Sequence, residues 1–427
     1  MPVDFATLKA QVSQKAADYK NRVERIQTLL ERARHTLRHA HLSLADIRSR
    51  VETAVKQNKG WRGAMPTKEP LGKGFPPPEV SLEGVVVLAA DGSQINPDPH
   101  GEVYFGLVNL GLVAMDRGQT PITLVRSHLL LSELHEREGF EASVLLRRDL
   151  YERLGLAWAA ALIHGNQDTL HALESTFHNL GWAPQGVQPA EVERLKAFHP
   201  HPTRVVALTD GPLELWGPRR EEGYGDFQKS LAHYKQALKH LQDLGVAPVG
   251  YVDNPRADLV VRMLELVAED GAPPSDAHHP WAGVRDQDLW VEWLPPGHRT
   301  ALFQIRAQYL EEYEEALRPH FFYLNVGLAQ NKPILARVEL PAWVAQQPEA
   351  VDLVHAVLLW QGSIVPGRLY PYILHRAHET AVVTHEDRRQ VTWMVQHALL
   401  TKGLTADRRS HKQRAKDDSA KRNHYER

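Results

Sequence analysis

Two short apolar runs, each followed at once by Asp-Gly, constrain this chain more than any other feature. Residues 85–90 are rich in β-branched side chains and precede Asp91, and residues 205–209 have the same character and precede Asp210. Such runs predict buried strands that stop at a turn. A carboxylate at the end of a buried strand is held rigidly while its oxygens face a cleft, which suits hard cations such as Mg²⁺ or Mn²⁺. One Asp-Gly pair is usually just a turn, so the prediction of a cation site depends on both strand ends together.

The segments around these runs alternate between strand and helix patterns. Strands are predicted at 103–113, 122–126, 247–252, 321–326 and 334–340, and helices at 143–162, 227–244, 257–268, 350–360 and 388–400. This alternation is typical of α/β folds with crossover helices. The three consecutive strands after residue 84 favour an antiparallel start. We therefore expect a mixed sheet flanked by helices.

Composition divides the chain into segments. Residues 1–58 have apolar side chains at three- and four-residue steps among many basic ones, which predicts an N-terminal helical arm. Residues 59–84 are rich in Gly, Pro and Lys and are expected to be a linker. Residues 85–401 are the expected catalytic domain, with insertions near 164–202 and 272–298. Residues 402–427 form a basic tail with almost no large apolar side chain, and we expect it to be disordered.

Composition also excludes several classes of site. The chain has no cysteine, so disulfides, thiolate zinc sites and cysteine nucleophiles are excluded. The formal net charge is −2, so any DNA-binding surface must be a local basic patch. No signal-peptide pattern and no apolar run of membrane-spanning length is found. We expect a soluble, cytoplasmic protein with no membrane partner.

Two further segments carry candidate site residues. Residues 370–379 read YPYILHRAHE, and His378 could ligate a metal ion or position water there; the alternative is a hydrogen-bonded histidine on a surface helix. On the helix predicted at 143–162, Asp149 and Glu152 are three residues apart and share one face. One of them could complete a carboxylate cluster, and the alternative is an ordinary intrahelical charge pattern. His279, in the second insertion, is expected to be a loop residue.

Four motifs in this order resemble those of the NurA family of DNA nucleases. They are the strand before Asp91-Gly92-Ser93, the strand before Asp210-Gly211-Pro212, the Arg-x-Glu-x-Pro pattern of residues 337–341, and the Tyr-Pro…Ala-His pattern of residues 370–378. The resemblance implies an RNase H-like sheet, cleavage of DNA with Mn²⁺ (or Mg²⁺) as cofactor, a homodimer, and a HerA-like hexameric ATPase as partner.

By position in these motifs, Asp91 and Asp210 match the family's metal-binding aspartates, and Tyr370 and His378 match its Tyr and His. Glu152 is the best match for the acidic residue on the intervening helix. The family often has Ser-Lys after the next strand, but residues 250–256 read GYVDNPR, so that lysine is absent. Arg256 is the candidate to replace its phosphate contact.

The leading hypothesis is a DNA nuclease that processes DNA ends in recombinational repair. Asp91, Glu152, Asp210 and His378 would hold two divalent ions, and Tyr370 would position water or phosphate. Arg147, Arg148 and Arg256 would contact the DNA backbone. The alternative is a DNA-binding clamp or adaptor on the same fold with a weakened site, which the absent lysine favours. An RNase H-like transferase acting on RNA or mobile DNA also fits the carboxylates, but the two late motifs argue against it.

Overall fold

A computed structural model describes most of the chain. The described residues are 4–39, 42–98, 103–118, 120–131, 139–182, 189–198, 204–217, 224–268, 279–327 and 333–403. The part of the tail expected to be disordered that begins at residue 404 therefore lies outside the described residues. The chain divides into two compact units, and each is considered by itself. Unit one comprises Met1–Ser81, Gly211–Leu213 and Val249–Tyr370, and unit two comprises Leu82–Asp210, Glu214–Pro248 and Pro371–Arg427.

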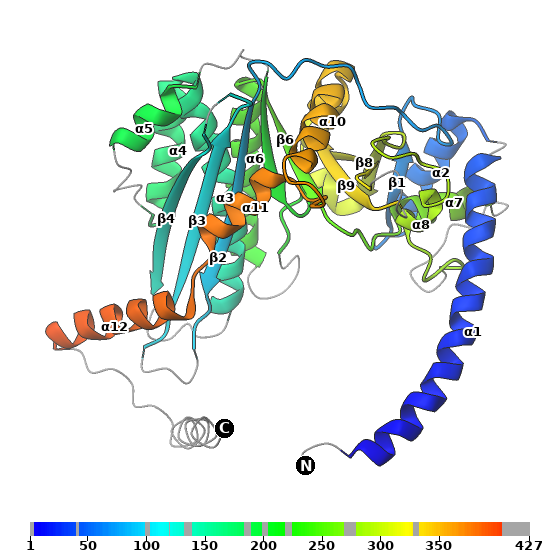
Figure 1. Ribbon diagram of the computed structural model, residues 1–427, viewed down its shortest axis with the longest axis horizontal. Coiled ribbons are helices and arrows are strands. Elements are labelled where there is room, and N and C mark those ends of the chain that lie inside the picture. The colour runs from blue at the N-terminus through cyan, green and yellow to red at the C-terminus, as the bar shows by residue number, and fades with distance from the viewer. Residues whose placement is uncertain are drawn as a thin grey trace. The chain divides into compact units, whose positions relative to one another are not determined.

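Unit two is built on an antiparallel meander of three strands joined by a fourth, parallel strand (Figure 1). The meander consists of β2 (Val86–Ile95), β3 (Phe105–Met115) and β4 (Ile122–Leu131). Each strand pairs antiparallel with the next, and β5 (Val205–Asp210) pairs parallel with β2. A meander whose first strand is flanked by the parallel fourth strand is the arrangement of RNase H-like cores. The predicted α/β, RNase H-like mixed sheet is confirmed.

The strand β2 differs from the prediction in one respect. The sequence predicts that this strand stops at Asp91, but β2 continues through Asp91, Gly92 and Ser93 to Ile95. The parallel pairing with β5 is recorded only as far as Ala90, opposite Thr209, whereas β3 stays paired with β2 up to Ile95. Hydrogen bonds to β3 satisfy the backbone N–H and C=O groups of β2 beyond Asp91. The strand is therefore stable although its second half is polar.

Two helices cover opposite faces of this meander. On β3, a Cβ added to Gly155 of α3 (Phe140–His164) would lie 2.8 Å from the Leu110 side chain. A Cβ added to Gly111 would lie 2.7 Å from the backbone oxygen of Ala377, in α11 (Tyr372–Ala381). Successive residues of a strand point to opposite faces, so α3 and α11 lie on opposite sides of β3. Figure 1 shows α11 crossing in front of the strands and α3 behind them.

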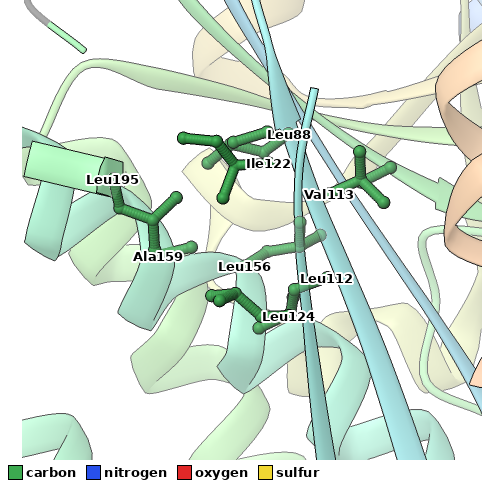
Figure 2. A pocket seen from close by; sticks show the side chains of 10 residues that line it. Leu88, Leu112, Val113, Ile122, Leu124, Leu156, Ala159 and Leu195 are labelled. Carbon is green, nitrogen blue, oxygen red and sulfur yellow. The ribbon is translucent and has the colours of Figure 1, made fainter. Parts of the chain in front are cut away.

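The other helices of unit two are α4 (Gln167–Asn179), α5 (Pro189–Lys196), α6 (Tyr224–Asp243) and α12 (His385–Thr401). Helices α4 and α5 fall in the insertion expected near 164–202. The helix α3 ends where Gly165 adopts a left-handed conformation (φ 64°), and Thr384 and Asp387 form a capping box at the start of α12. A void of about 10 Å³ lies in the core of unit two. Figure 2 shows the apolar side chains that line it, such as Leu112 and Leu156. This void is a small packing defect of the core and offers no ligand site.

Unit one holds an antiparallel run of strands in the order β1-β7-β8-β9-β6. These are β1 (Arg62–Pro66), β7 (Phe303–Ala307), β8 (Pro319–Asn325), β9 (Leu335–Pro341) and β6 (Val246–Val252), of which β6 begins in unit two. The strands β1 and β7 were not predicted. The strand β1 lies within the segment expected to be a linker: three of its five residues are buried, and it pairs with β7 along its whole length.

The helices of unit one include the expected N-terminal arm. That arm forms two helices, α1 (Phe5–Arg38) and α2 (Leu44–Gln57), and a capping box of Ser43 and Asp46 starts the second. The others are α7 (Leu259–Ala268), α8 (Asp286–Trp290), α9 (Ala342–Ala345) and α10 (Pro348–Ser363), with short 3₁₀ turns at Gln308–Glu312 and Glu315–Leu317. No helix in the described residues has both the length and the apolar character needed to cross a bilayer.

Candidate active site

The two aspartates predicted from the strand ends belong to neighbouring strands. Ala90 of β2 and Thr209 of β5 are partners in the parallel pairing, and Asp91 and Asp210 are the next residue of each strand. The register therefore places the two aspartates side by side and on the same face of the sheet. Asp210 is exposed, whereas only 17% of the Asp91 side chain is exposed. The structure thus brings this part of the predicted site together.

The face that carries Asp91 is the face covered by α11. Asp91 is the register partner of Gly111, the residue against which the α11 backbone packs. From α11, His378 extends to Asp91, with 2.8 Å between His378 Nδ1 and Asp91 Oδ2. The His378 side chain is 67% exposed. His378 is therefore both a hydrogen-bonded histidine on a surface helix and a member of the predicted site.

Glu152 approaches β2 from the opposite face, at Gly92. A Cβ on Gly92 would lie 2.7 Å from Glu152 Oε1 and 2.5 Å from Arg148 Cγ. Any other residue at position 92 would therefore push the carboxylate away from the strand. The glycine after Asp91 allows this close approach, so its role here is steric and it does not form a turn.

Glu152 is a buried carboxyl group near other acids. Its side chain is 8% exposed, and it makes two long ion pairs, each of 3.7 Å, with Arg148 Nε and Arg153 NH1. Burial raises the pKa of Glu152 well above its ordinary value, and the nearby charges of Asp149 and Asp91 raise this pKa further, while Arg153 lowers it. A strongly raised carboxyl pKa beside other acids marks a place that favours a positive charge.

Arg148, predicted to contact DNA, lies among these carboxylates. Its Nε and NH2 donate to Asp149 Oδ1 at 3.1 and 2.7 Å, and its NH1 donates to Gln94 Oε1 at 2.9 Å. Burial alone would lower the pKa of Arg148, but the charges of Asp149, Glu152 and Asp91 raise it. Arg148 therefore stays positively charged among these carboxylates.

Arg153 supports Glu152 from within the core. Its NH1 donates to the backbone oxygen of Asp149 at 2.7 Å, and its guanidinium lies 5.3 Å from the centre of the Tyr234 ring. Its side chain is 8% exposed. The sequence analysis did not single out Arg153 or Gln94. The signal available in the sequence for Arg153 was its place directly after Glu152 on the predicted helix. The contact of Gln94 with Arg148 depends on strand register.

The turn that follows Asp210 is fixed within unit one. The amide of Leu213 donates to Glu339 Oε2 at 2.8 Å, and Arg337 Nε donates to Glu339 Oε1 at 2.8 Å. Gly211 has φ 94°, which favours glycine, and its amide donates to the backbone oxygen of Tyr251 at 2.7 Å. The Arg-x-Glu motif therefore anchors the Asp-Gly-Pro turn.

The other predicted residues lie as follows. Tyr370, in unit one, packs edge-to-face on Tyr251, with 5.6 Å between ring centres. Arg256, also in unit one, is exposed after β6. Arg147 of α3 donates to the backbone oxygen of Leu180 at 2.8 Å and more weakly, at 3.4 Å, to Tyr151. Contacts of Arg147, Arg148 and Arg256 with DNA stay predictions.

Comparisons with known proteins identify the family of this chain. Residues 85–383 match the model of the NurA domain family. Among solved structures, the NurA nuclease from Sulfolobus solfataricus is 12% identical with a TM-score of 0.49, over 92% of this chain and 98% of that one. The catalytic domain of human Endonuclease V is 12% identical with a TM-score of 0.29, over 84% and 96%. RuvC from Thermus thermophilus is 13% identical with a TM-score of 0.13, over 45% and 86%. No curated protein sequence matches significantly. The NurA match spans well over half of the sequence, so the chain belongs to the NurA domain family.

Proposed function

We propose that this chain is a metal-dependent DNA nuclease whose centre is built from Asp91, Glu152, Asp210 and His378. Membership of the NurA family supports a nuclease. The observation that carries the proposal is that Asp91, paired with His378 on one face of β2, and the buried Glu152, which approaches Gly92 from the other face, lie on neighbouring elements of one compact unit. Carboxylates grouped on neighbouring strands and a helix are the ligands that phosphoryl-transfer enzymes use for divalent ions.

The donor set fits Mn²⁺ or Mg²⁺ in its chemistry. Within the described residues, no three His, Asp or Glu side chains are grouped closely enough to hold an ion as they stand. Yet the donors are carboxylate oxygens, which these ions prefer. The space next to Glu152 is also kept open by Gly92, whose missing Cβ would otherwise fill it. We propose two ions per site, held by Asp91, Glu152, Asp210 and His378.

The residues have distinct roles in this proposal. A bound divalent ion would lower the pKa of a water molecule and neutralise charge on the scissile phosphate. Asp91 is oriented by His378, whose ring fixes one of its oxygens. Glu152 brings a charge into a desolvated position, where its attraction for a cation is strongest. Tyr370 would position water or phosphate.

The finer biological assignments are proposals as well. We propose that the substrate is DNA, gripped through its phosphates by Arg256, Arg147 and other basic residues. We propose a homodimer that works with a HerA-like hexameric ATPase on DNA ends in recombinational repair. The exposed apolar side chains of α1, such as Val12 and Tyr19 (57% and 68% exposed), are consistent with a further protein contact.

The test uses purified full-length protein and linear DNA labelled at one end. We expect cleavage with Mn²⁺, weaker cleavage with Mg²⁺, none with Ca²⁺ and none in excess EDTA. The variant Asp210→Asn should bind DNA and fail to cleave it. Cleavage that persists in EDTA would contradict the metal proposal. DNA binding without cleavage under every metal condition would favour the alternative, a clamp or adaptor on this fold.

A further inference from the structure

Within the described part of the chain, Arg148 is held through side chains only, and most of those side chains are acidic. Its hydrogen bonds go to Asp149 and Gln94, and its Nε lies 3.7 Å from Glu152 Oε1. Asp91 is close enough to contribute to its electrostatic environment. One guanidinium therefore faces the charges of three carboxyl groups, including two of the proposed metal ligands.

The neighbouring Arg153 shows what a scaffolding arginine looks like on this helix. The Arg153 side chain is 8% exposed, donates to a backbone oxygen at 2.7 Å, and lies over the Tyr234 ring. The Arg148 side chain is 29% exposed. Its long flexible stem and partly solvated head allow it to change partners at small cost, which Arg153 cannot do.

We propose that Arg148 is a built-in counter-cation of the carboxylate site, and that it and a divalent ion compete for the same carboxylates. This inference rests on the proposed function. A divalent ion beside Glu152 would repel a guanidinium whose Nε lies 3.7 Å from Glu152 Oε1. Binding of the ion would therefore release Arg148 from Glu152 toward solvent, where its planar donors suit a phosphate group.

Arg148 could act as a competitor of the ion or as a structural support for the carboxylates, and these two roles predict opposite effects of removing it on ion binding. If Arg148 served mainly to hold the carboxylates in place, its removal would weaken ion binding. If Arg148 is a competitor, its removal leaves the carboxylates uncompensated, and they bind an added ion more tightly. The sign of the change in affinity therefore separates the two roles without any measurement of cleavage.

The experiment measures Mn²⁺ binding to the full-length, metal-free protein, by the electron paramagnetic resonance signal of free Mn²⁺ and by isothermal titration calorimetry. We compare wild type, Arg148→Gln, and the matched control Arg389→Gln, whose arginine pairs with Glu386 on the exposed surface of α12. We expect Arg148→Gln to bind Mn²⁺ about fivefold more tightly than wild type, and Arg389→Gln to match wild type.

A second variant keeps the test valid if Arg148→Gln folds poorly. Gln94→Ala removes the hydrogen bond that holds Arg148 from the β2 side and leaves every carboxylate in place. It should tighten Mn²⁺ binding by a smaller factor, about twofold. The rise in melting temperature on adding Mn²⁺ should increase in the same order, from wild type to Gln94→Ala to Arg148→Gln.

Two negative results have different meanings. Unchanged or weaker Mn²⁺ binding by folded Arg148→Gln and Gln94→Ala, with clear binding by wild type, would overturn the competition and leave the proposed nuclease intact. Absence of Mn²⁺ and Mg²⁺ binding by wild type and all variants would instead overturn the proposed metal centre, and this inference with it.

Discussion

Each unit of the molecule contains a histidine paired with carboxylates, and the two clusters differ in how completely their charges are satisfied. In unit one, His279 lies between Asp258 and Glu265, with 2.9 Å from Nε2 to Asp258 Oδ2 and a short contact from Nδ1 to Glu265. In unit two, His378 contacts Asp91 through Nδ1, and the Glu152 carboxylate has only long ion pairs.

The unit-one cluster is closed. Both ring nitrogens of His279 have acidic partners, and Glu265 Oε1 also accepts from the Trp281 amide at 2.8 Å. The adjacent Asp286 accepts from the amides of Val260 and Val261 at the start of α7. Such a cluster fixes the insertion containing residues 279–290 to α7 and has little capacity left for a ligand. His279 was expected to be an ordinary loop residue, and its position shows that a loop histidine can be structural.

The unit-two cluster is open. His378 is two-thirds exposed, and Glu152 is desolvated beside acids that raise its pKa. A histidine and carboxylates alone do not distinguish a functional site from a structural one. The distinction lies in hydrogen bonding: the carboxylates of the closed cluster contact His279 and accept from backbone amides, whereas Glu152 in the open cluster has only ion pairs of 3.7 Å. The predictions below test this difference, from the largest expected effect to the smallest.

Glu152→Gln should have the largest effect. The substitution keeps the size of the side chain and removes the charge that faces the proposed ions. We expect the rate of DNA cleavage to fall at least about a hundredfold. The melting temperature should stay the same or rise, because a buried and poorly compensated carboxyl group is replaced by a neutral one. Cleavage at the wild-type rate would remove Glu152 from the site.

His279→Gln should lower stability, with a defined pH dependence. Its hydrogen bonds to Asp258 and Glu265 raise the pKa of His279 to about 9, despite burial and the nearby Arg262. A raised pKa stabilises the fold fully below the unfolded pKa of 6.5, and this contribution is lost as pH rises through 9. The loss in His279→Gln should be on the order of 2 kcal/mol at pH 6 and much smaller above pH 9.

The measurement for His279→Gln is urea unfolding between pH 6 and pH 10. Burial raises the pKa of Asp286 to about 7, so its stabilising contribution also falls as pH rises through 7 and should persist in the variant. A wild-type unfolding free energy that does not decrease between pH 7 and pH 9 would show that the cluster is not charged as described.

Gly92→Ala tests the close approach in the open cluster. An added Cβ would meet Glu152 Oε1 and Arg148 Cγ, which can move because both belong to flexible side chains. We expect cleavage to fall about tenfold with little change in melting temperature, because misplacing a ligand costs rate more than stability. Gly225→Ala is the matched control, since a Cβ there meets nothing within 4 Å. Equal cleavage rates for the two variants would show that the approach at Gly92 is unimportant.

Tyr323→Phe should have the smallest effect. The Tyr323 hydroxyl donates to Asp286 Oδ2 at 2.7 Å in the core of unit one. Its removal should lower the unfolding free energy by about 1 kcal/mol, because Asp286 keeps its two backbone donors. Cleavage should be unchanged. A substantial loss of cleavage without loss of stability would indicate that the closed cluster takes part in function.

Much of the fold is predictable from the sequence because its signals are local. The β-branched runs that end near Asp91 and Asp210 form strands, as predicted. Residues 143–162, whose apolar side chains recur with helical spacing, form part of a helix. The strands β1 and β7 lie in short segments with weak alternation, and their existence depends on each other's hydrogen bonds. Pairing between residues more than 200 positions apart leaves no local pattern to detect.

The sequence indicates which residues are candidates for the site, but it does not indicate how their side chains are arranged. Asp91 and His378 are far apart in sequence: the apolar run before Asp-Gly indicated Asp91, the segment 370–379 indicated His378, and the order of the motifs linked them. The position of Arg148 among the carboxylates could not be predicted, because it depends on the register that puts Gln94 and Gly92 on the α3 face of β2. Arg148, a side chain predicted to contact DNA, has acidic partners within the chain, and the strand register explains this.

The most direct test compares Asp91→Asn and His279→Gln, with cleavage of end-labelled DNA in Mn²⁺ and thermal unfolding measured on the same preparations. The account predicts that Asp91→Asn loses cleavage and keeps its melting temperature within a few degrees of wild type, while His279→Gln melts lower and cleaves at the wild-type rate at temperatures where it is folded. Undiminished cleavage by folded Asp91→Asn would contradict the central claim that the open cluster of unit two is the nuclease site.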